Sequence, residues 1–352
     1  MRVLSIGTDR KLFEKGSGVY TRQKLYADRF GQLDIIVFTK VGPSGITKVG
    51  PLQVIPTASV LKLLYGFDAW RIARHLPRPD VVTTQDPFET GLCGFFISWW
   101  LGVPLHVQVH TDFLSKEFVR GSLQNRVRVL IAWFVLRRAA RIRVILERTS
   151  DELRATGISA PISVLPIFVD VERWAKIPRV KHPRWKIALL CIGRLEKEKR
   201  FEIVIDALSA ARAAGHDAGL TIVGEGSEGA RLEARAQKLG LSGRIEFVGW
   251  QSDVSKYYSE ADLVLVPSQY EGYAIVIIEA LAAGIPVLST DVGVAREAGA
   301  IVVDAQDFSH AVQTWMKGGP RKATLSGYPY ANRLTYNERY CADIAETAGR
   351  VI

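Results

Sequence analysis

Short apolar runs recur along the chain, and most are followed by a longer segment whose apolar positions have helical spacing. Runs of this length, bounded by turn residues, are typical of buried β-strands. In the first half they predict strands at 3–6, 35–38, 52–55, 81–84, 105–109, 142–145 and 162–165. In the second half they predict strands at 187–192, 220–223, 245–248, 263–266, 287–289 and 301–303. Strands alternating with helices indicate an α/β fold with two parallel sheets in tandem.

A polar segment between prolines at 178–183 (PRVKHP) interrupts this pattern, and we interpret it as a linker. It predicts a domain of residues 1–180 and a second domain that begins at 181. A length of 352 residues also favours two domains over one.

Composition is that of a soluble globular protein, with 48% apolar and 23% charged residues. Cys93, Cys191 and Cys341 are far apart, which argues against a disulfide framework or a zinc cluster and fits the reducing cytoplasm. The apolar segment 91–104 is too short to span a membrane, so we expect a core helix there. The first apolar run is too short for a signal peptide.

Positive charge is concentrated in the first half. Residues 1–182 hold 27 of the 46 basic and 15 of the 36 acidic side chains, a balance of +12, which leaves −2 for the remainder. Such an excess can attract nucleic acid, phosphorylated substrates or an anionic membrane surface. Charge alone does not choose among them.

A predicted helix over residues 123–139 is both basic and apolar, and no acid occurs between Phe118 and Leu146. This pattern is typical of a helix that lies on an anionic membrane, although a core helix with a solvated basic face has it too. Nucleic acid is not expected, because no recognition motif accompanies the charge. The candidate membrane-binding residues are Arg126, Arg128, Trp133, Arg137 and Arg138.

The stretch from Ala261 to Glu297 holds the most informative residues. Glu271 follows the strand predicted at 263–266, and Glu279 falls two turns into the helix expected next. Both can face one cleft at the carboxyl end of the strand, where open α/β sheets bind ligands. The alternative is a pair of ordinary surface glutamates.

Cations follow the first strand of the second half, in the run Gly193-Arg-Leu-Glu-Lys-Glu-Lys-Arg200. Arg194 and Lys199 can neutralise the oxygens of a diphosphate, unless this is a solvated turn. Gly193 and, after the next strand, Gly224 would let the backbone approach a ligand closely.

Two features of the first half lie at strand ends. Gly18 belongs to a glycine-containing loop after the first strand, and a helix N-terminus beyond it would favour an anion. His110 ends the strand predicted at 105–109, where chemistry occurs in this architecture. The alternative for the Gly18 loop is a plain turn, and the alternative for His110 is a structural role.

Together these motifs resemble the retaining glycosyltransferases of family 4, which have the GT-B fold. The matching stretches are the strand with GRLxxxK, then VGEG, FVGW and PSxYEG-x6-EALAxGxPV, in which Glu271 and Glu279 form the E-x7-E pair. The glycine loop, His110 and the stretch 166–170 also match in place, so the resemblance spans almost the whole chain. Tyr273-Ala274 and the single Gly293 depart from the pairs that are frequent in the family.

The resemblance implies two Rossmann-like domains that face each other across a cleft. Residues 1–180 would bind the acceptor, residues 181–329 the donor, and residues 330–352 would return as a helix toward the first domain. The donor would be a UDP- or GDP-activated hexose. Donor contacts would come from Gly18, Gly193, Arg194, Lys199, Gly224, Glu271, Gly272, Tyr273 and Glu279.

Within that set the resemblance implies distinct roles. Arg194 and Lys199 would bind the diphosphate, Glu279 the ribose, and Glu271 the sugar. His110 would contact the transferring sugar near its 6-position. We expect His110, Arg194, Lys199 and Glu271 to be the catalytic residues.

The chain contains no Asp-x-Asp triplet, so the cations must stabilise the charge that a metal would otherwise stabilise. We therefore expect metal-independent transfer, with no metal site and no cofactor beyond the nucleotide sugar as co-substrate.

The basic helix favours a lipid-linked or cell-envelope glycan as acceptor, with the protein bound peripherally at the inner face of the membrane; a soluble acceptor is the competing possibility. Two further alternatives stay open. One is a sugar-nucleotide epimerase of similar fold, and the other is a non-catalytic protein that binds nucleotide sugars or nucleic acid.

Overall fold

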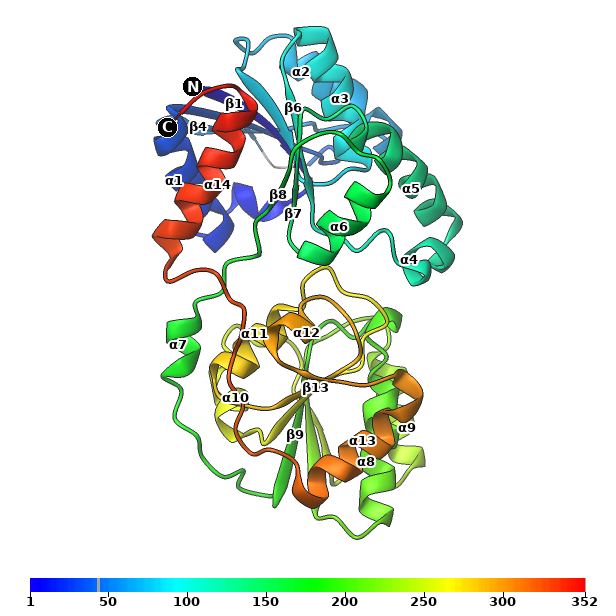
Figure 1. The fold of residues 1–352 in the computed structure, drawn as a ribbon. Helices are drawn as coiled ribbons and strands as arrows, with labels where there is room; N and C mark the ends of the chain where they lie inside the picture. Colours follow the sequence, from blue (N-terminus) through cyan, green and yellow to red (C-terminus); the bar gives the residue numbers. More distant parts are fainter. Residues whose placement is uncertain (43–44, 352) are drawn as a thin grey trace. The chain divides into compact units, whose positions relative to one another are not determined.

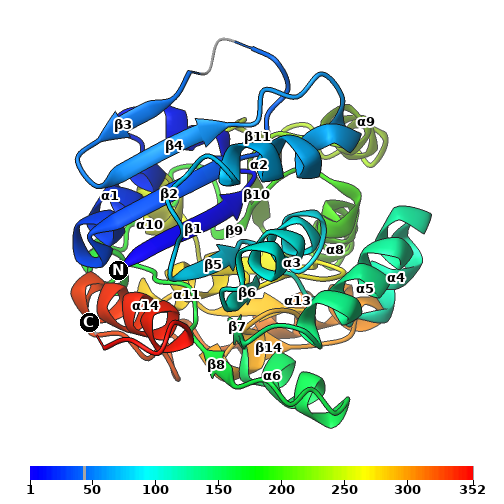
Figure 2. The same cartoon turned by 90° about the horizontal axis from the view of Figure 1, so that it is seen from above.

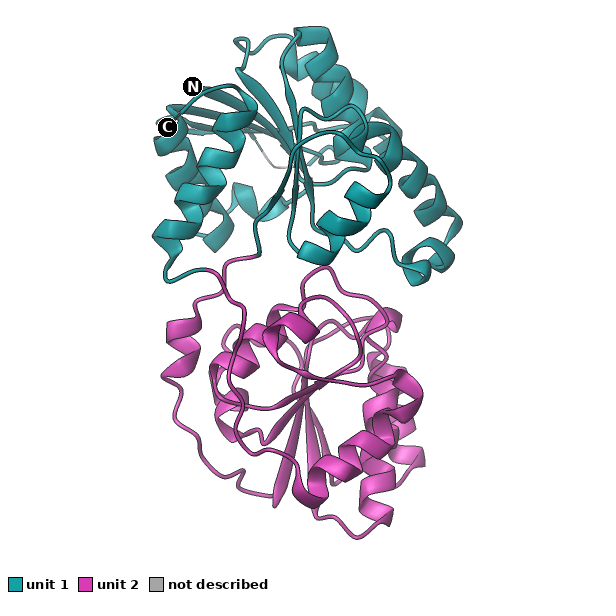
Figure 3. Ribbon diagram, viewed as in Figure 1, with its two compact units in different colours: residues 1–166, 330–352 teal, residues 167–329 magenta. Residues whose placement is uncertain are grey.

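A computed structural model describes residues 1–42 and 45–351. The chain forms two compact units (Figure 3), the first made of residues 1–166 with the C-terminal segment from 330, and the second of residues 167–329. The division therefore lies at 166/167 and not at 180/181. The C-terminal segment belongs to the first unit.

The boundary differs because the segment 178–183 packs on the second unit. The Arg179 guanidinium donates hydrogen bonds to the carbonyls of Tyr258 and Ala261, and the Val180 amide donates to the Ser259 carbonyl at 3.0 Å. The prolines and charges that suggest a linker thus belong to an extended strap that is held by backbone carbonyls.

The first unit is built on an eight-stranded sheet in the order β3-β4-β2-β1-β5-β6-β7-β8. All neighbouring pairs are parallel except β3 with β4, an antiparallel edge that hydrophobic periodicity did not predict. The strands are β1 (Arg2–Gly7), β2 (Gln32–Val37), β3 (Thr47–Val49), β4 (Leu52–Pro56), β5 (Val81–Thr84), β6 (Leu105–Val109), β7 (Arg141–Val144) and β8 (Ile162–Val164).

Helices cover both faces of this sheet (Figures 1 and 2). Helices α1 and α14 lie side by side on one face, and α3 packs on the other between α2 and α5. The helices of the first unit are η1 (Arg10–Phe13), α1 (Gly18–Phe30), η2 (Lys62–Leu64), α2 (Tyr65–Ala73), α3 (Glu89–Leu101), α4 (Lys116–Gly121), α5 (Leu123–Leu136), α6 (Glu147–Ala155) and α14 (Arg333–Thr347).

Helix α14 is fastened to the first sheet by buried polar groups. His106 on β6 lies 2.9 Å from an Asp343 carboxylate oxygen, and Ser163 on β8 donates to the other oxygen at 2.6 Å. The His106 imidazole is buried, which lowers its pKa. A neutral His106 therefore donates from Nε2 to Asp343 and accepts from Thr83 at Nδ1, which joins strands β5 and β6 to the C-terminal helix.

The second unit has a six-stranded parallel sheet in the order β11-β10-β9-β12-β13-β14. Its strands are β9 (Ile187–Ile192), β10 (Ala218–Val223), β11 (Ile245–Phe247), β12 (Leu263–Val266), β13 (Val287–Ser289) and β14 (Ile301–Val302). Its helices are α7 (Val171–Ala175), η3 (Lys197–Lys199), α8 (Phe201–Ala213), α9 (Gly229–Lys238), α10 (Ser255–Glu260), α11 (Ile275–Ala282), α12 (Ala295–Ala298), η4 (Ala305–Asp307) and α13 (Phe308–Gly318). Helices α8 and α13 pack together, and their apolar faces bury one continuous core against the strands.

The apolar segment 91–104 does form a helix, α3, but not a fully buried one. Ile97 is buried, whereas Phe96 and Trp99 are 52% and 74% exposed. This helix therefore presents an aromatic face to solvent.

Candidate functional site

The order of strands in the second sheet creates one crevice at its centre. The chain proceeds from β9 to β10 and β11 on one side, then returns to place β12 beside β9, with Val264 paired to Leu190. Loops that leave the two strands diverge at this point, and ligands bind there in open α/β sheets. The loops after β9 and β12 carry the cations and glutamates singled out in the sequence.

An ion pair joins these two loops. The Lys199 ammonium lies 2.5 Å from a carboxylate oxygen of Glu271, and the Ser268 hydroxyl donates to the same oxygen at 2.7 Å. Both charged side chains are mostly buried. Arg194 is different, because it is largely exposed and pairs with Glu198 at 3.2 Å.

Backbone contacts fix the geometry of the two loops. The Arg200 guanidinium donates to the carbonyls of Pro267 and Ser268, each at 2.9 Å, and the Gln269 amide donates to the Glu198 carbonyl at 2.7 Å. Arg200 itself has a left-handed backbone with φ +49°. These contacts hold Lys199 and Glu271 within bonding distance.

Gly193 and Gly224 touch each other at the ends of β9 and β10. A Cβ on Gly224 would stand 1.9 Å from the Gly193 carbonyl oxygen, and both glycines have positive φ. Any side chain at position 224 would force these loops apart. Glycine is thus required at 224 by close backbone approach, whereas at 193 a Cβ would approach no atom closer than 3.6 Å.

Gly272 and Tyr273 lie in the loop between Glu271 and helix α11. Tyr273 is buried, and its carbonyl accepts a hydrogen bond from the Val294 amide at 3.0 Å. Ala274 follows with φ +66°, in a region that L-residues with a Cβ seldom adopt. Gly293 packs against the Tyr273 carbonyl, where a Cβ would approach to 2.4 Å.

Glu279 is half-buried on α11, a little more than one turn from its start at Ile275 and not the two turns expected. The Tyr258 hydroxyl of α10 donates to its carboxylate at 2.9 Å. Burial raises the pKa of Glu279 to about 7, against the smaller opposing effects of Tyr258 and Arg173. Glu279 and Glu271 therefore have different partners and different electrostatic surroundings.

His110 follows β6 in the first unit. Its Nε2 lies 3.1 Å from the Gln108 side-chain oxygen, which also accepts from the Arg143 guanidinium. Arginine only donates, so Arg143 orients the Gln108 amide with its oxygen toward His110. Burial, with Arg143 nearby, lowers the pKa of His110 to about 3. His110 is thus neutral, protonated on Nε2, with Nδ1 left as an acceptor.

Gly18 is the first residue of α1, and Ser17 caps the helix by accepting from the Tyr20 amide at 3.1 Å. A Cβ on Gly18 would meet no atom within 4 Å. The helix N-terminus expected after the glycine loop is therefore present, with open space beside Gly18.

The basic helix is α5, and its candidate residues have different surroundings. Arg126, Arg137 and Arg138 are exposed, whereas Arg128 pairs with Glu89 at 2.8 Å. Trp133 packs edge-on against Phe113 and beneath the Arg137 guanidinium. The most exposed apolar side chains of this helix are Leu123, Val127 and Leu130.

Within residues 1–42 and 45–351, no three or more His, Cys, Asp or Glu side chains gather in a way that could hold a metal ion. The described helices also include none that is long and apolar enough to cross a bilayer.

The sequence did not identify several residues that contact the candidate site residues, either at the β9/β12 crevice or around His110. Ser268 belongs to a family motif and Arg200 ends the cationic run after β9, but only the structure shows that Ser268 donates to Glu271 and that Arg200 donates to backbone carbonyls of the β12 loop. Tyr258 lies in a polar helix far along the chain from Glu279, and Gln108 and Arg143 lie inside strands that read as ordinary core. No local pattern identifies these last three.

Two parallel-sheet units with this topology define the chain as a GT-B protein. The sequence model of "Glycosyl transferases group 1" matches residues 172–328, and that of "Glycosyl transferase 4-like domain" matches residues 40–167. The chain belongs to glycosyltransferase family 4.

Relatives and solved structures agree with this assignment. The chain is 30% identical to glycogen synthase of Mycobacterium tuberculosis (strain CDC 1551 / Oshkosh) over 63% of its own length and 54% of that protein, so it spans about half of that relative. It is 26% identical to the lipopolysaccharide core biosynthesis mannosyltransferase LpsB of Rhizobium meliloti (strain 1021), over 63% of this chain and 71% of that one. The fold matches the crystal structure of Anabaena HepE in complex with UDP, with a TM-score of 0.66, 19% identity and coverage of 98% and 95% of the two chains.

The raised pKa of Glu279 predicts a specific pH dependence of stability. Its folded pKa lies above that of an unfolded glutamate, so its stabilising contribution is complete below about pH 4.5 and is lost as the pH rises through about 7. Near pH 4.5, Glu279→Gln should have about the same free energy of unfolding as the wild type. Near pH 8.5 its free energy of unfolding in urea should exceed that of the wild type by roughly 3 kcal/mol.

Glu233→Gln, on the exposed surface of α9, is the matched control and should show no such divergence. Parallel pH profiles for the two variants would contradict the assigned environment of Glu279.

Proposed function

We propose that this chain is a retaining glycosyltransferase that moves a hexosyl group from a UDP- or GDP-sugar to an acceptor. The observation that carries the proposal is the Lys199–Glu271 pair at the crevice between β9 and β12. A cation and a carboxylate held 2.5 Å apart by two rigid loops suit a ligand that is anionic at one end and hydroxylated at the other.

In this proposal the donor diphosphate binds Lys199 and Arg194 and takes the place of Glu271 as the partner of Lys199. Gly193 and Gly224 let the backbone approach the nucleotide, because neither carries a side chain. Arg194 is exposed and pairs with Glu198 of its own loop, so it can turn toward phosphate.

Glu279 would hold the ribose. Two vicinal hydroxyls suit a bidentate carboxylate, and Tyr258 fixes the orientation of that carboxylate by donating to it. An ionised carboxylate accepts hydrogen bonds from hydroxyls more strongly than a protonated one. With a pKa of about 7 in the free protein, Glu279 should therefore bind ribose most strongly above that pH. The hydroxyls would supply the donors that its half-buried carboxylate lacks.

The transferring sugar would be held by Glu271, by the backbone of Gly272 and Tyr273, and by His110. A neutral His110 with a free Nδ1 can accept a hydrogen bond from a hydroxyl near the sugar 6-position. Gly18, at the N-terminus of α1, would bring backbone N–H groups toward the phosphates or the acceptor.

Breaking a glycosyl–phosphate bond develops positive charge on the sugar and negative charge on the leaving diphosphate. We assign the leaving-group charge to Lys199 and Arg194, and the sugar charge to Glu271. The reaction proposed here therefore uses no metal and no cofactor beyond the nucleotide sugar.

For the acceptor we propose a lipid-linked or cell-envelope glycan, reached by peripheral binding at the cytoplasmic face of the membrane. Helix α3 packs against both α2 and α5 (Figure 1), and η2 and these three helices carry exposed apolar side chains. One relative is named for lipopolysaccharide core biosynthesis, which supports a membrane glycan over a soluble acceptor. The exposed apolar residues are Leu63, Phe67, Phe96, Trp99, Trp100, Leu123, Val127 and Leu130.

The role of Lys199 can be tested once a thermal-shift screen has identified the UDP- or GDP-hexose that binds. Lys199→Ala should lower kcat for release of the nucleoside diphosphate about 100- to 1000-fold, because it removes one preorganised charge from the leaving group. Lys197→Ala, an exposed neighbour in η3, is the control and should keep nearly full activity.

Equal activities for the two lysine variants would contradict the assigned role. Donor turnover that needs no acceptor and yields an isomeric nucleotide sugar would instead identify an epimerase.

Metal independence is tested separately. Activity measured after treatment with EDTA should remain within about twofold of the untreated enzyme, because the side-chain cations stabilise the leaving group. Loss of activity in EDTA followed by recovery in magnesium would overturn this part of the proposal.

Membrane binding can be measured by sedimentation with liposomes that contain phosphatidylglycerol. The double variant Arg137→Glu, Arg138→Glu should bind at least about tenfold more weakly, since each basic residue near such a surface contributes about 1 kcal/mol. Binding by the wild type should also weaken in high salt.

The matched control is Lys238→Glu with Lys256→Glu, two exposed lysines of the second unit, and it should bind like the wild type. If both double variants lose affinity equally, net charge and not the α5 surface accounts for binding.

A further inference from the structure

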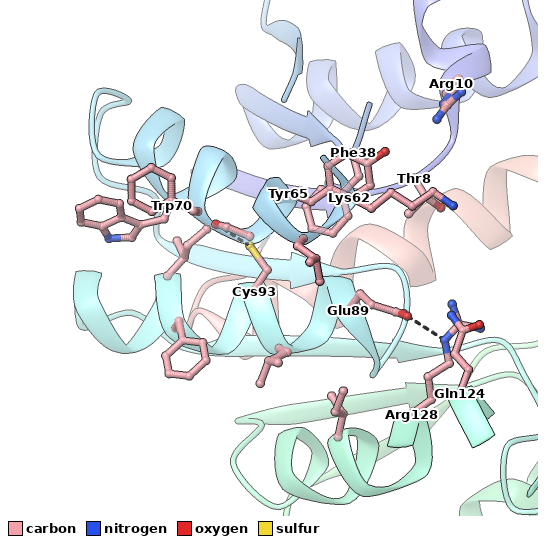
Figure 4. Close-up of a pocket in the computed structure, with 17 residues that line it drawn as sticks. Thr8, Arg10, Phe38, Lys62, Tyr65, Trp70, Glu89, Cys93, Gln124 and Arg128 are labelled. Atoms are coloured by element: carbon pink, nitrogen blue, oxygen red, sulfur yellow. Dashed lines mark hydrogen bonds and ion pairs between the residues drawn. The ribbon is translucent and has the colours of Figure 1, made fainter. Parts of the chain in front are cut away.

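The first unit contains a cavity of about 810 Å³ between η2 and α2 on one side and α3 and α5 on the other (Figure 4). This volume is within the usual range for sites that hold a small molecule. Its wall consists mainly of apolar side chains from these four elements. None of the catalytic or donor-binding residues proposed above lines it.

The two ends of the cavity differ in chemistry. Figure 4 shows Trp70 at one end, with Arg10, Thr8, Gln124 and Arg128 at the other. Arg128 is neutralised there by Glu89 at 2.8 Å. Arg10 and Lys62 also line the cavity and have no ion-pair partner among the residues that the structure describes. The polar end thus has an excess of positive charge.

The apolar end opens to solvent. The Phe67 ring lies 6.0 Å from that of Trp70, and Phe67 and Phe96, which both line the cavity, are each more than half exposed. A chain longer than the cavity could therefore continue outward over the apolar faces of α2 and α3.

The position of the cavity relates it to the first sheet. Thr8 follows β1 and Phe38 follows β2, while Glu89 begins the helix after β5. The strand order reverses at β1, with β2 on one side and β5 on the other. The polar end of the cavity therefore lies at the switch point of this sheet, where α/β folds bind ligands.

We propose that this cavity binds the lipid anchor of the acceptor glycan, and that the anchor is an anionic lipid whose hydrocarbon chain occupies the apolar end, while a hydroxyl of the attached glycan receives the sugar. The lipid phosphate would lie against Arg10 and Lys62, beside the strand ends. The inference rests on the proposed function and extends it by assigning a site and a chemical class, a long-chain alkyl or prenyl phosphate. A cavity with an unneutralised cationic end and an aromatic open end is complementary to such a molecule and not to a soluble sugar.

Soluble alkyl phosphates test the site without a donor or a membrane. Binding of dodecyl phosphate, hexyl phosphate and inorganic phosphate to the full chain is measured by calorimetry below the micelle concentration. Each buried methylene strengthens binding roughly fourfold, so dodecyl phosphate should bind at least about tenfold more tightly than hexyl phosphate. Equal affinity for the three ligands would overturn the proposal, because the apolar end would then contribute nothing.

A larger side chain inside the cavity should exclude the hydrocarbon chain of the ligand. Gly66 lines it on α2, and a Cβ there would meet no atom within 4 Å, so Gly66→Leu can fold and occupy the space. This variant should bind dodecyl phosphate at least about tenfold more weakly. Gly243→Leu, an equally open glycine of the second unit, should leave binding unchanged. Unchanged binding in Gly66→Leu would overturn the proposal.

Two further pairs of variants test the ends of the cavity. Phe96→Asp should weaken binding of dodecyl phosphate, whereas Trp99→Asp, on the same helix but outside the cavity, should not. Lys62→Glu should weaken binding of all three phosphates, whereas Lys24→Glu on α1 should not. Equal losses within either pair would mean that binding is non-specific, which contradicts the assigned site.

Failure of this inference is distinguishable from failure of the proposed function. Binding of a UDP- or GDP-hexose and its weakening by Lys199→Ala are measured without an acceptor, so neither requires the cavity to be occupied. A chain that transfers sugar but binds dodecyl phosphate no better than inorganic phosphate would have the proposed activity and a different acceptor site.

Discussion

The parallel pairing of β9 with β12 is the constraint on which the candidate site depends. Both strands point the same way, so the loops that leave them emerge at one edge of the sheet. Lys199 and Glu271, 72 positions apart in the chain, then become neighbours. The ion pair is a consequence of topology, because no local interaction could bring these side chains together.

Topology alone does not set the distance between the two charges. Arg200 and Gln269 join the loops through backbone carbonyls, and Gly193 and Gly224 allow the neighbouring loops to touch. These contacts reduce the freedom of the pair before any ligand binds. A preorganised charge costs little reorganisation at the moment of reaction, which is the condition for effective electrostatic stabilisation.

Much of this architecture could be predicted from the sequence, since strands buried on both faces are continuous apolar runs. The strands β5, β6, β9, β12 and β13 have the predicted bounds. The short edge strand β3 escaped prediction because Thr47–Val49 has too few apolar positions to show a period. The boundary between units was misplaced because prolines and charges mark an exposed segment, whatever it packs against.

The candidate site was predictable to the extent that its residues occur in contiguous motifs. Glu271, Lys199 and His110 stand out because each lies in a segment that follows a strand, and Glu279 stands out by its spacing from Glu271. Their partners do not stand out. Tyr258, Gln108 and Arg143 act on them through contacts between distant elements, and in the sequence they are an ordinary tyrosine, glutamine and arginine.

The two units share one topological feature, a reversal of strand order, but different side chains surround it in each unit. In each sheet the order reverses beside the first strand of the unit, at β1 and at β9, and polar groups gather at the carboxyl ends there. In the second unit the loops carry paired charges and glycines, which suit a nucleotide. In the first unit the same region opens into a cavity whose far wall is aromatic. Loop and helix composition, not the sheet, therefore determines what each unit can bind. In our proposal, the excess positive charge of the first half therefore binds a lipid phosphate, and the nearly neutral second half binds a sugar nucleotide.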